Sequence, residues 1–303
     1  MSKRVLITGG SGLIGRALAK ELGDHGHQVM ILSRNPAKVV GLPAGVGVEK
    51  WDGRTAEGWG ELIESGCAIV NLAGAGIADQ RWTESRKRVI LDSRLLAGQA
   101  VMDAVRQAKS KPEVIVQASA TGYYGPDGSF DKYEASPPGT DFLSQVCVKW
   151  EESTAAVEAL GVRWVVARTG FVLSSKGGAL PRLAMPFRFF VGGPVGSGRQ
   201  WVPWIHIADE VGAIRFLIEN SDTSGAYNLA APTPATNRTL SRELGSTLKR
   251  PALMPAPAPM IRLMFGEMSS VLLAGQRAVP SRLLAAGYKF RFPELRPALR
   301  DLL

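Results

Sequence analysis

Short apolar runs alternate with amphipathic stretches along most of the chain. The apolar runs predict buried strands, and apolar residues at helical spacing predict the helices between them. We expect strands at residues 5–8, 28–32, 46–51, 67–74, 113–118, 163–168 and 225–230. We expect helices at residues 13–22, 83–109, 141–160 and 208–219. This alternation predicts an α/β fold with a doubly wound parallel sheet and right-handed crossovers.

Three glycines, Gly9, Gly12 and Gly15, lie between the first strand and the first helix. Glycine lets the main chain approach a pyrophosphate closely, and a helix N-terminus offers free N–H groups and a partial positive charge. A glycine triplet that follows a strand and opens a helix predicts a dinucleotide site, with Leu13 and Ile14 beside the phosphates. An ordinary glycine-rich turn is the alternative.

Ser33 and Arg34 end the second strand, where the adenosine ribose is expected. An acidic residue here would bond the ribose 2′-hydroxyl of NAD, whereas a hydroxyl and a guanidinium favour the 2′-phosphate of NADP. We therefore expect NADP rather than NAD, although Arg34 is alternatively an exposed residue that begins a loop. Asp52 follows the third strand and is either a partner of the adenine amino group or a turn residue.

Two further strand ends predict the walls of the site. Leu72, Ala73 and Gly74 end the fourth strand with small residues that permit close approach to a cofactor. The fifth strand leads into the hydroxyl-rich segment 119–125. In open α/β sheets these carboxyl ends face the ligand.

Beyond residue 173 the pattern loosens. Residues 174–206 are rich in glycine and proline and predict a long functional loop. In this loop Arg199 is either a substrate anchor or a solvated side chain, and His206 either binds substrate or is a satisfied histidine beside Trp204. We expect a Rossmann-like NADP-binding domain at 1–235 and a smaller, mainly helical C-terminal domain at 236–303 on the substrate side.

Composition narrows the function classes. The 303 residues are 45% hydrophobic, and 36 Lys and Arg against 27 Asp and Glu give a formal charge of +9. The basic residues are scattered apart from residues 86–88, which disfavours a nucleic-acid partner. Cys67 and Cys147 lack metal-ligand spacing and predict buried thiols, so no metal site is expected. With no apolar run of about 18 residues and no leader pattern, we expect no membrane contact and a cytoplasmic protein.

Several motifs together resemble the extended and atypical short-chain dehydrogenase/reductases, specifically the sugar-nucleotide-epimerase-like proteins with their own C-terminal domain of unknown function. The resemblance covers essentially the whole chain. Its motifs are TGGSGLIG at 8–15, LSR at 32–34, NLAG at 71–74, DSR at 92–94, SATGYYG at 119–125, GGPVGSGRQWVPWIHIAD at 192–209 and FGEMSSVLLAGQRAVPSRLLAAGYKF at 265–290. The resemblance implies an NADP site lined by Ser33, Arg34, Leu72, Ala73, Arg94, Lys149, Gly170 and Phe171.

The chain departs from this superfamily at its catalytic pair. Catalytic members use Tyr-x-x-x-Lys, in which the lysine lowers the pKa of the tyrosine so that it can exchange a proton. Here Lys149 stands four residues after Gln145, which cannot exchange a proton. We expect Lys149 to bind mainly the ribose, and a surface lysine is the alternative. Catalytic candidates are then Ser119 and, as substitutes for the missing tyrosine, Thr121, Tyr123 and Tyr124. The alternative for either tyrosine is a packing role.

The expected function is that of an NADP-dependent oxidoreductase or nucleotide-sugar epimerase-like enzyme, acting by hydride transfer on an unidentified small substrate. A nucleotide sugar is the default substrate by analogy of fold alone. The alternative is a non-catalytic NADP-binding sensor or interaction protein, which agrees with Gln145 and with the cell-division-inhibitor label attached to some similar proteins. The pattern does not decide the oligomeric state.

Overall fold

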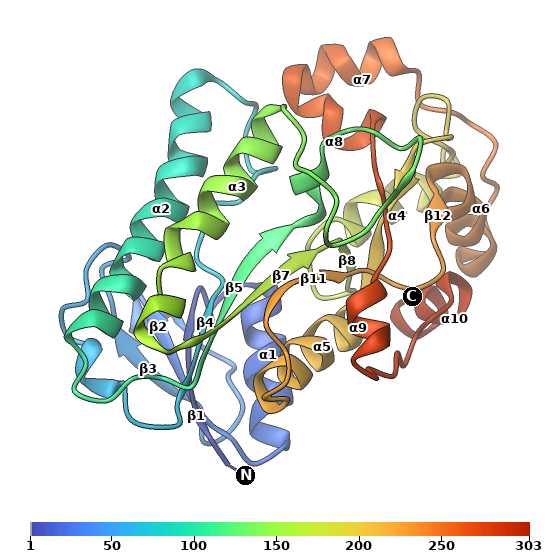
Figure 1. Cartoon of the computed structure of the whole chain (residues 1–303). Helices are drawn as coiled ribbons and strands as arrows, with labels where there is room; N and C mark the ends of the chain where they lie inside the picture. The colour runs from blue at the N-terminus through green and yellow to red at the C-terminus, as the bar shows by residue number, and fades with distance from the viewer. Residues whose placement is uncertain (1) are drawn as a thin grey trace.

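A seven-stranded parallel sheet organises the computed structural model, which describes residues 2–303 (Figure 1). Its strand order is β11-β7-β5-β4-β1-β2-β3. The strands are β1 (Arg4–Thr8), β2 (Gln28–Ser33), β3 (Gly47–Lys50), β4 (Ala68–Asn71), β5 (Val114–Ala120), β7 (Arg163–Thr169) and β11 (Gly225–Leu229). From β1 the chain adds β2 and β3 on one side, and it then adds β4 and the later strands on the other side of β1. Ligands bind outside the carboxyl ends of strands at such a switch point.

Helices cover both faces of this sheet. The helices α1 (Leu13–Asp24) and α5 (Ile207–Glu219) pack together on one face, and α2 (Glu84–Gln107) and α3 (Phe142–Ala155) pack together on the other. Each face of the sheet has its own hydrophobic core. Successive residues of β1 pack in different cores, because the side chains of a strand point alternately to opposite faces. Ile7 packs into the core under α1 and α5, and Leu6 packs into the core under α2.

The α/β class and the parallel sheet are confirmed, and the differences lie in single elements. The helix expected at 141–160 ends at Ala155 and is followed by a turn of 3₁₀ helix at Glu158–Leu160. The expected loop 174–206 contains a helix, α4 (Leu180–Arg188). Its buried residues Leu180, Ala184 and Phe187 recur at helical spacing, but Pro186 within the helix obscures that pattern.

Short elements complete the fold, and all but the first of them lie in the second half of the chain. They are β6 (Asp131–Lys132), β8 (Phe171–Leu173), β9 (Trp201–Val202), β10 (Trp204–His206), β12 (Ala235–Thr236), α6 (Asn237–Leu248), α7 (Ala258–Phe265), α8 (Ser270–Leu273), β13 (Arg277–Ala278), α9 (Ser281–Ala285) and α10 (Leu295–Leu302). Further 3₁₀ turns lie at Pro36–Lys38, Gly60–Leu62, Thr121–Tyr124 and Gly266–Ser269.

A third core joins this region to the rest of the chain. Phe187 and Trp204 from before residue 235 pack in it with Leu240, Leu244 and Leu299 from after it. The division at 235/236 therefore remains a prediction, since the two parts share buried side chains. None of the helices described between residues 2 and 303 is long and apolar enough to cross a membrane.

Candidate cofactor and substrate site

The glycine turn between β1 and α1 packs tightly against the loop that follows β4. Gly9 has φ of +66°, and a Cβ on it would lie 2.7 Å from the carbonyl carbon of Leu72. A Cβ on Gly15 would lie 2.5 Å from the Cα of Gly10. These glycines are needed by the packing of the protein itself, because contacts below 3 Å from a Cβ force the main chain to move.

Gly12 has a different environment. A Cβ there would meet only the carbonyl oxygen of Gly9, at 3.3 Å. Gly12 is the N-cap of α1, no side chain caps the helix, and its first turn holds no acidic residue. The N–H groups of Leu13 and Ile14 thus belong to an uncapped first turn. This arrangement fits a pyrophosphate, which would accept hydrogen bonds from the helix N-terminus.

The end of β2 presents an exposed cation. Arg34 is exposed and its aliphatic carbons lie beside Gly53, while Ser33 is buried and its Oγ accepts a hydrogen bond of 3.2 Å from the N–H of Asn35. The exposed guanidinium fits the 2′-phosphate expected there.

The carboxylate of Asp52 stabilises a turn in this region. Its Oδ1 accepts hydrogen bonds from the N–H groups of Arg54 and Thr55, at 2.8 and 2.9 Å, and its Oδ2 accepts one from the Thr55 hydroxyl. Both oxygens therefore hold the turn after β3. Of the two interpretations of Asp52, the structure shows the turn residue.

The loop after β4 is supported from beneath by Arg94. The Arg94 guanidinium donates hydrogen bonds to the carbonyl oxygens of Ala75 and Ile90, at 3.1 and 2.8 Å, and lies 4.6 Å from the ring centroid of Trp150. Burial lowers the pKa of Arg94. Arg94 is also in contact range of Gly74, so it shapes the wall that Leu72, Ala73 and Gly74 form beside the glycine turn.

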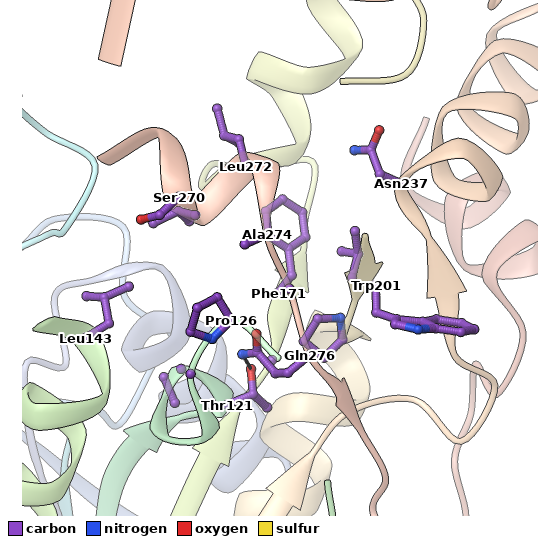
Figure 2. A pocket seen from close by; sticks show the side chains of 18 of the residues that line it. Thr121, Pro126, Leu143, Phe171, Trp201, Asn237, Ser270, Leu272, Ala274 and Gln276 are labelled. Atoms are coloured by element: carbon purple, nitrogen blue, oxygen red, sulfur yellow. Dashed lines mark hydrogen bonds between the residues drawn. The ribbon is translucent and has the colours of Figure 1, made fainter. Parts of the chain in front are cut away.

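A cavity of about 230 Å³ lies beyond the carboxyl ends of β5 and β7 (Figure 2). Its walls come from the turn after β5, the start of α3, the β7–β8 connection, α4, β9, the start of α6 and residues 270–276. Gly170 and Phe171 are both lining residues. Gly170 cannot be larger, because a Cβ would lie 2.1 Å from the carbonyl oxygen of Pro203.

Two hydroxyl-bearing residues of the strand ends line this cavity. The Oγ1 of Thr121 accepts a hydrogen bond of 3.1 Å from Nε2 of Gln276, as Figure 2 shows. The hydroxyl of Thr169 donates a hydrogen bond of 2.7 Å to Oε1 of Glu210. Glu210 is fully buried on α5, its Oε2 has no partner among the described residues, and burial raises its pKa to about 8.

The other expected catalytic hydroxyls face away from the cavity. Ser119 is buried and donates a hydrogen bond of 2.6 Å to Oε1 of Glu151. The Tyr124 hydroxyl donates one of 2.6 Å to Oδ1 of Asn228 and accepts one of 3.1 Å from Arg168. Burial raises the pKa of Tyr124 to about 12. Neither Ser119 nor Tyr124 lines the cavity, and within 119–124 Thr121 is the hydroxyl residue that does.

Tyr123 also packs against the protein's own side chains. Its ring lies edge-on to that of Tyr124, with centroids 5.3 Å apart, and the guanidinium of Arg168 lies 3.5 Å from the Tyr123 ring centroid. Tyr123 is not a lining residue of the cavity. The two tyrosines and Arg168 thus form a packed cluster behind the turn.

The helix face turned toward the cavity is not the one that carries Lys149. Lys149 and Gln145 are both exposed, and Gln145 donates a hydrogen bond to the carbonyl oxygen of Thr140. Leu143 lines the cavity, and Cys147 lies one turn later with its Sγ about 4.0 Å from a Cβ placed on Gly122. Lys149 does not line the cavity, and its contact with the cofactor ribose stays a prediction.

Leu143 and Cys147 bring no proton exchange at neutral pH. Leucine has no titratable group, and burial raises the pKa of Cys147 to about 11. The positions of α3 that face the turn after β5 are therefore apolar or neutral.

The expected substrate anchors lie elsewhere. Arg199 is exposed and is not among the residues that line the cavity. Trp204 is buried and donates a hydrogen bond of 3.1 Å to the carbonyl oxygen of Thr233. His206 is buried at the N-terminus of α5, where its Nδ1 accepts from the N–H of Ala208.

His206 is a structural residue that joins α5 to the last helix. Its Nε2 lies 3.2 Å from Oδ2 of Asp301, and its ring lies 3.9 Å from that of Phe292. Burial lowers the pKa of His206. His206 therefore packs between the protein's own elements and does not line the cavity.

Sequence reasoning missed two contributors to the cavity, residues 270–276 and Leu143, and two buried residues that contact its lining, Cys147 and Glu210. Residues 270–276 come from a segment that the sequence marks only as helical, and they reach the cavity through a fold-back from the C-terminus. Leu143 and Cys147 carry no chemical signal. Glu210 does carry one, since an acidic residue inside the apolar stretch 207–218 is unusual in a buried helix.

Comparison with known proteins agrees with this architecture. Residues 5–230 match the NAD dependent epimerase/dehydratase family, and residues 256–302 match a domain of unknown function, DUF1731. The epimerase family protein SDR39U1 of mouse is 38% identical over 307 residues, covering 99% of each chain. The epimerase family protein SH2119 of Staphylococcus haemolyticus is 38% identical over 304 residues, again covering 99% of each chain.

Solved structures give the same result. The crystal structure of human SDR39U1 (isoform 2) with NADPH has a TM-score of 0.87 and 35% identity, and the match covers 99% of this chain and 98% of that one. A nucleoside-diphosphate sugar epimerase from Corynebacterium glutamicum has a TM-score of 0.77 and 31% identity, covering 99% of this chain and 57% of that one. The chain therefore belongs to the NAD dependent epimerase/dehydratase family and carries a C-terminal DUF1731 region.

Proposed function

We propose that this chain binds NADPH and reduces a small carbonyl compound in the cavity beyond β5 and β7. The observation that carries the proposal is that the uncapped glycine turn and the cavity lie at the same carboxyl edge of the sheet. Gly12 leaves room for a pyrophosphate, Arg34 is free for a 2′-phosphate, and Gly170 and Phe171 line the cavity. The NADPH in the human relative supports the same cofactor here.

When bound, NADPH supplies a hydride to a carbonyl carbon. The task of the protein is then to orient the carbonyl group and to stabilise the negative charge that develops on its oxygen. Thr121 can do this, because its oxygen already accepts a hydrogen bond from Gln276 and its own O–H remains to be donated. A proton from solvent then adds to the negatively charged oxygen and completes the alcohol product.

The geometry favours reduction over epimerisation. A sugar epimerase needs a base to take a proton from a substrate hydroxyl. At the α3 positions that face the site, Leu143 lines the cavity and burial keeps the Cys147 thiol neutral. A hydrogen-bond donor such as Thr121 is enough to polarise a carbonyl group, but it does not serve as such a base.

A second candidate function is favoured by the same two residues. If Leu143 and Cys147 mark a site that has lost its chemistry, the chain binds NADPH as a regulatory ligand without turning it over. Oxidation of NADPH in the presence of carbonyl compounds distinguishes the two functions.

The cofactor site is tested by replacing Gly12. We expect Gly12→Val to abolish NADPH binding, measured by the fluorescence of the reduced nicotinamide, with a circular-dichroism spectrum like that of the parent. Gly23→Val is the matched control in the same helix, because a Cβ on Gly23 meets no atom within 4 Å. Normal NADPH affinity in Gly12→Val would place the cofactor elsewhere.

A further inference from the structure

The walls of the cavity are made mostly of apolar side chains. Those that surround it most directly are Ile77, Leu143, Phe171, Leu183, Leu240 and Val271. Figure 2 shows Leu143 and Phe171 on different walls of this space. Burial of apolar surface contributes about 25 cal/mol per Å², so these walls favour a ligand with an apolar body.

The charge of the lining disfavours phosphates. Within residues 2–303, Asp141 is the only charged residue that lines the cavity, and no Lys, Arg or His does so. A nucleotide diphosphate brings at least two negative charges, and burying them without cations or aligned N–H groups costs several kcal/mol. Asp141 adds repulsion to that cost.

The two longer helices that begin at the cavity, α3 and α6, are already capped at their N-termini, whereas the four-residue α8 has no side-chain cap. At α3, Asp141 accepts a hydrogen bond of 3.2 Å from the N–H of Ser144. At α6, the Thr236 hydroxyl oxygen accepts one of 3.2 Å from the N–H of Thr239. These N-termini would be the natural phosphate sites in the absence of a cation, but the protein's own side chains satisfy them.

The guanidinium of Arg277 is held away from the interior. It lies 4.9 Å from the ring centroid of Trp201, and its Nε lies 2.8 Å from Oδ1 of Asp131. Trp201 also lines the cavity, where its ring forms an apolar part of the wall. Arg277 is therefore already paired with Asp131.

From these walls we infer that the substrate is a small, uncharged carbonyl compound with an apolar or aromatic body, and not a nucleotide-diphosphate sugar. The hydroxyl of Thr121 offers a carbonyl oxygen a donor at one edge of the cavity, whereas the Thr169 hydroxyl is already donated to Glu210. The inference rests on the proposed function, because it assigns the substrate class of that same site.

Calorimetry on the NADPH-loaded protein tests this inference with three ligands: acetophenone, its charged analogue 4-acetylbenzoate, and UDP-glucose. We expect acetophenone to bind more tightly than 4-acetylbenzoate and UDP-glucose not to bind. Binding of UDP-glucose, or tighter binding of the carboxylate, would overturn the inference and leave the NADPH site intact. Failure to load NADPH at all would instead contradict the proposed function.

A charge placed at the rim gives a second readout. Val271 lines the cavity and is 41% exposed, so a lysine there can reach both solvent and ligand. Val271→Lys should strengthen the binding of 4-acetylbenzoate by about two- to fivefold, the effect of one exposed ion pair. The control is Leu96→Lys on α2, where the parent side chain is 40% exposed and lies outside the cavity. An equal gain in both variants would contradict the placement of the ligand.

Discussion

Gln276 donates a hydrogen bond of 3.1 Å to the hydroxyl of Thr121, across 155 positions of the sequence. The contact links the turn after β5 to the segment that folds back from the C-terminus. It also fixes the role of the Thr121 oxygen as an acceptor, which leaves the O–H of Thr121 to be donated into the cavity. The DUF1731 region, which includes Gln276, thus helps to orient the group that we expect to bind the substrate carbonyl.

The first prediction concerns Thr121. Thr121→Val removes the donor to the developing oxyanion and should lower kcat by about 10²-fold with little change in NADPH affinity. Thr121→Ser keeps the hydroxyl and should restore most of the rate. Steady-state kinetics with an aryl ketone measures both variants. A Thr121→Val variant with the rate of the parent would remove Thr121 from the chemistry.

The second prediction concerns Tyr124. Because its hydroxyl is bonded to Asn228 and Arg168 inside the protein, Tyr124→Phe should lower the free energy of unfolding by about 1–3 kcal/mol. Turnover at a temperature where the variant is folded should stay unchanged. Tyr123→Phe is the control, since phenylalanine keeps the ring beside Arg168. A large loss of kcat in Tyr124→Phe without loss of stability would return Tyr124 to the catalytic group.

Glu210 makes stability depend on pH. Burial raises the pKa of Glu210 to about 8 in the folded chain, whereas an exposed glutamate in the unfolded chain has an ordinary pKa of 4.5. Between these values the folded chain holds a proton that the unfolded chain releases. Stability from Glu210 is therefore fully present below pH 4.5 and is lost as pH rises toward 8, by about 1.4 kcal/mol per pH unit.

Urea unfolding of the parent and of Glu210→Gln at several pH values measures this contribution. Glutamine cannot ionise, so the difference in unfolding free energy between variant and parent should shift in favour of the variant as pH rises. A difference that is constant from pH 5 to pH 8, within the range set by the raised pKa of about 8, would show that Glu210 does not titrate there.

Cofactor preference is the fourth prediction. If the exposed guanidinium of Arg34 binds the 2′-phosphate, NADPH should bind more tightly than NADH by about 1.5–3 kcal/mol, the worth of charge-assisted hydrogen bonds. Arg34→Ala should remove most of that margin and leave NADH affinity unchanged. Calorimetry with both cofactors measures it, and equal affinities in the parent would refute the role of Arg34.

The sequence predicts the sheet well because its signals are local. Each signal spans no more than about ten residues: the apolar run before Gly9, the apolar run before Leu72 and the glycine triplet. Buried parallel strands also have continuous apolar segments in their sequence. Arg34 closely follows the apolar run that predicts β2, so its place at the end of that strand is also given by a local signal.

The cavity is harder to predict because its walls meet only in three dimensions. Gln276 contacts Thr121 only in the folded chain, and no local sequence pattern predicts this contact. Lys149 illustrates a different difficulty. Its spacing from Gln145 imitates a known pair, but two residues along a helix turn a side chain by about 200°, and Leu143 and Cys147 take the inward positions.

The central claim is that the chain transfers a hydride from NADPH to a carbonyl compound. The most direct test uses NADPH that carries deuterium at the transferable C4 position, with acetophenone as the acceptor and mass spectrometry of the alcohol formed. We predict one deuterium at the carbinol carbon of the product and its loss in Gly12→Val. Tight binding of NADPH with no deuterium in the alcohol would contradict the claim and favour a regulatory cofactor site.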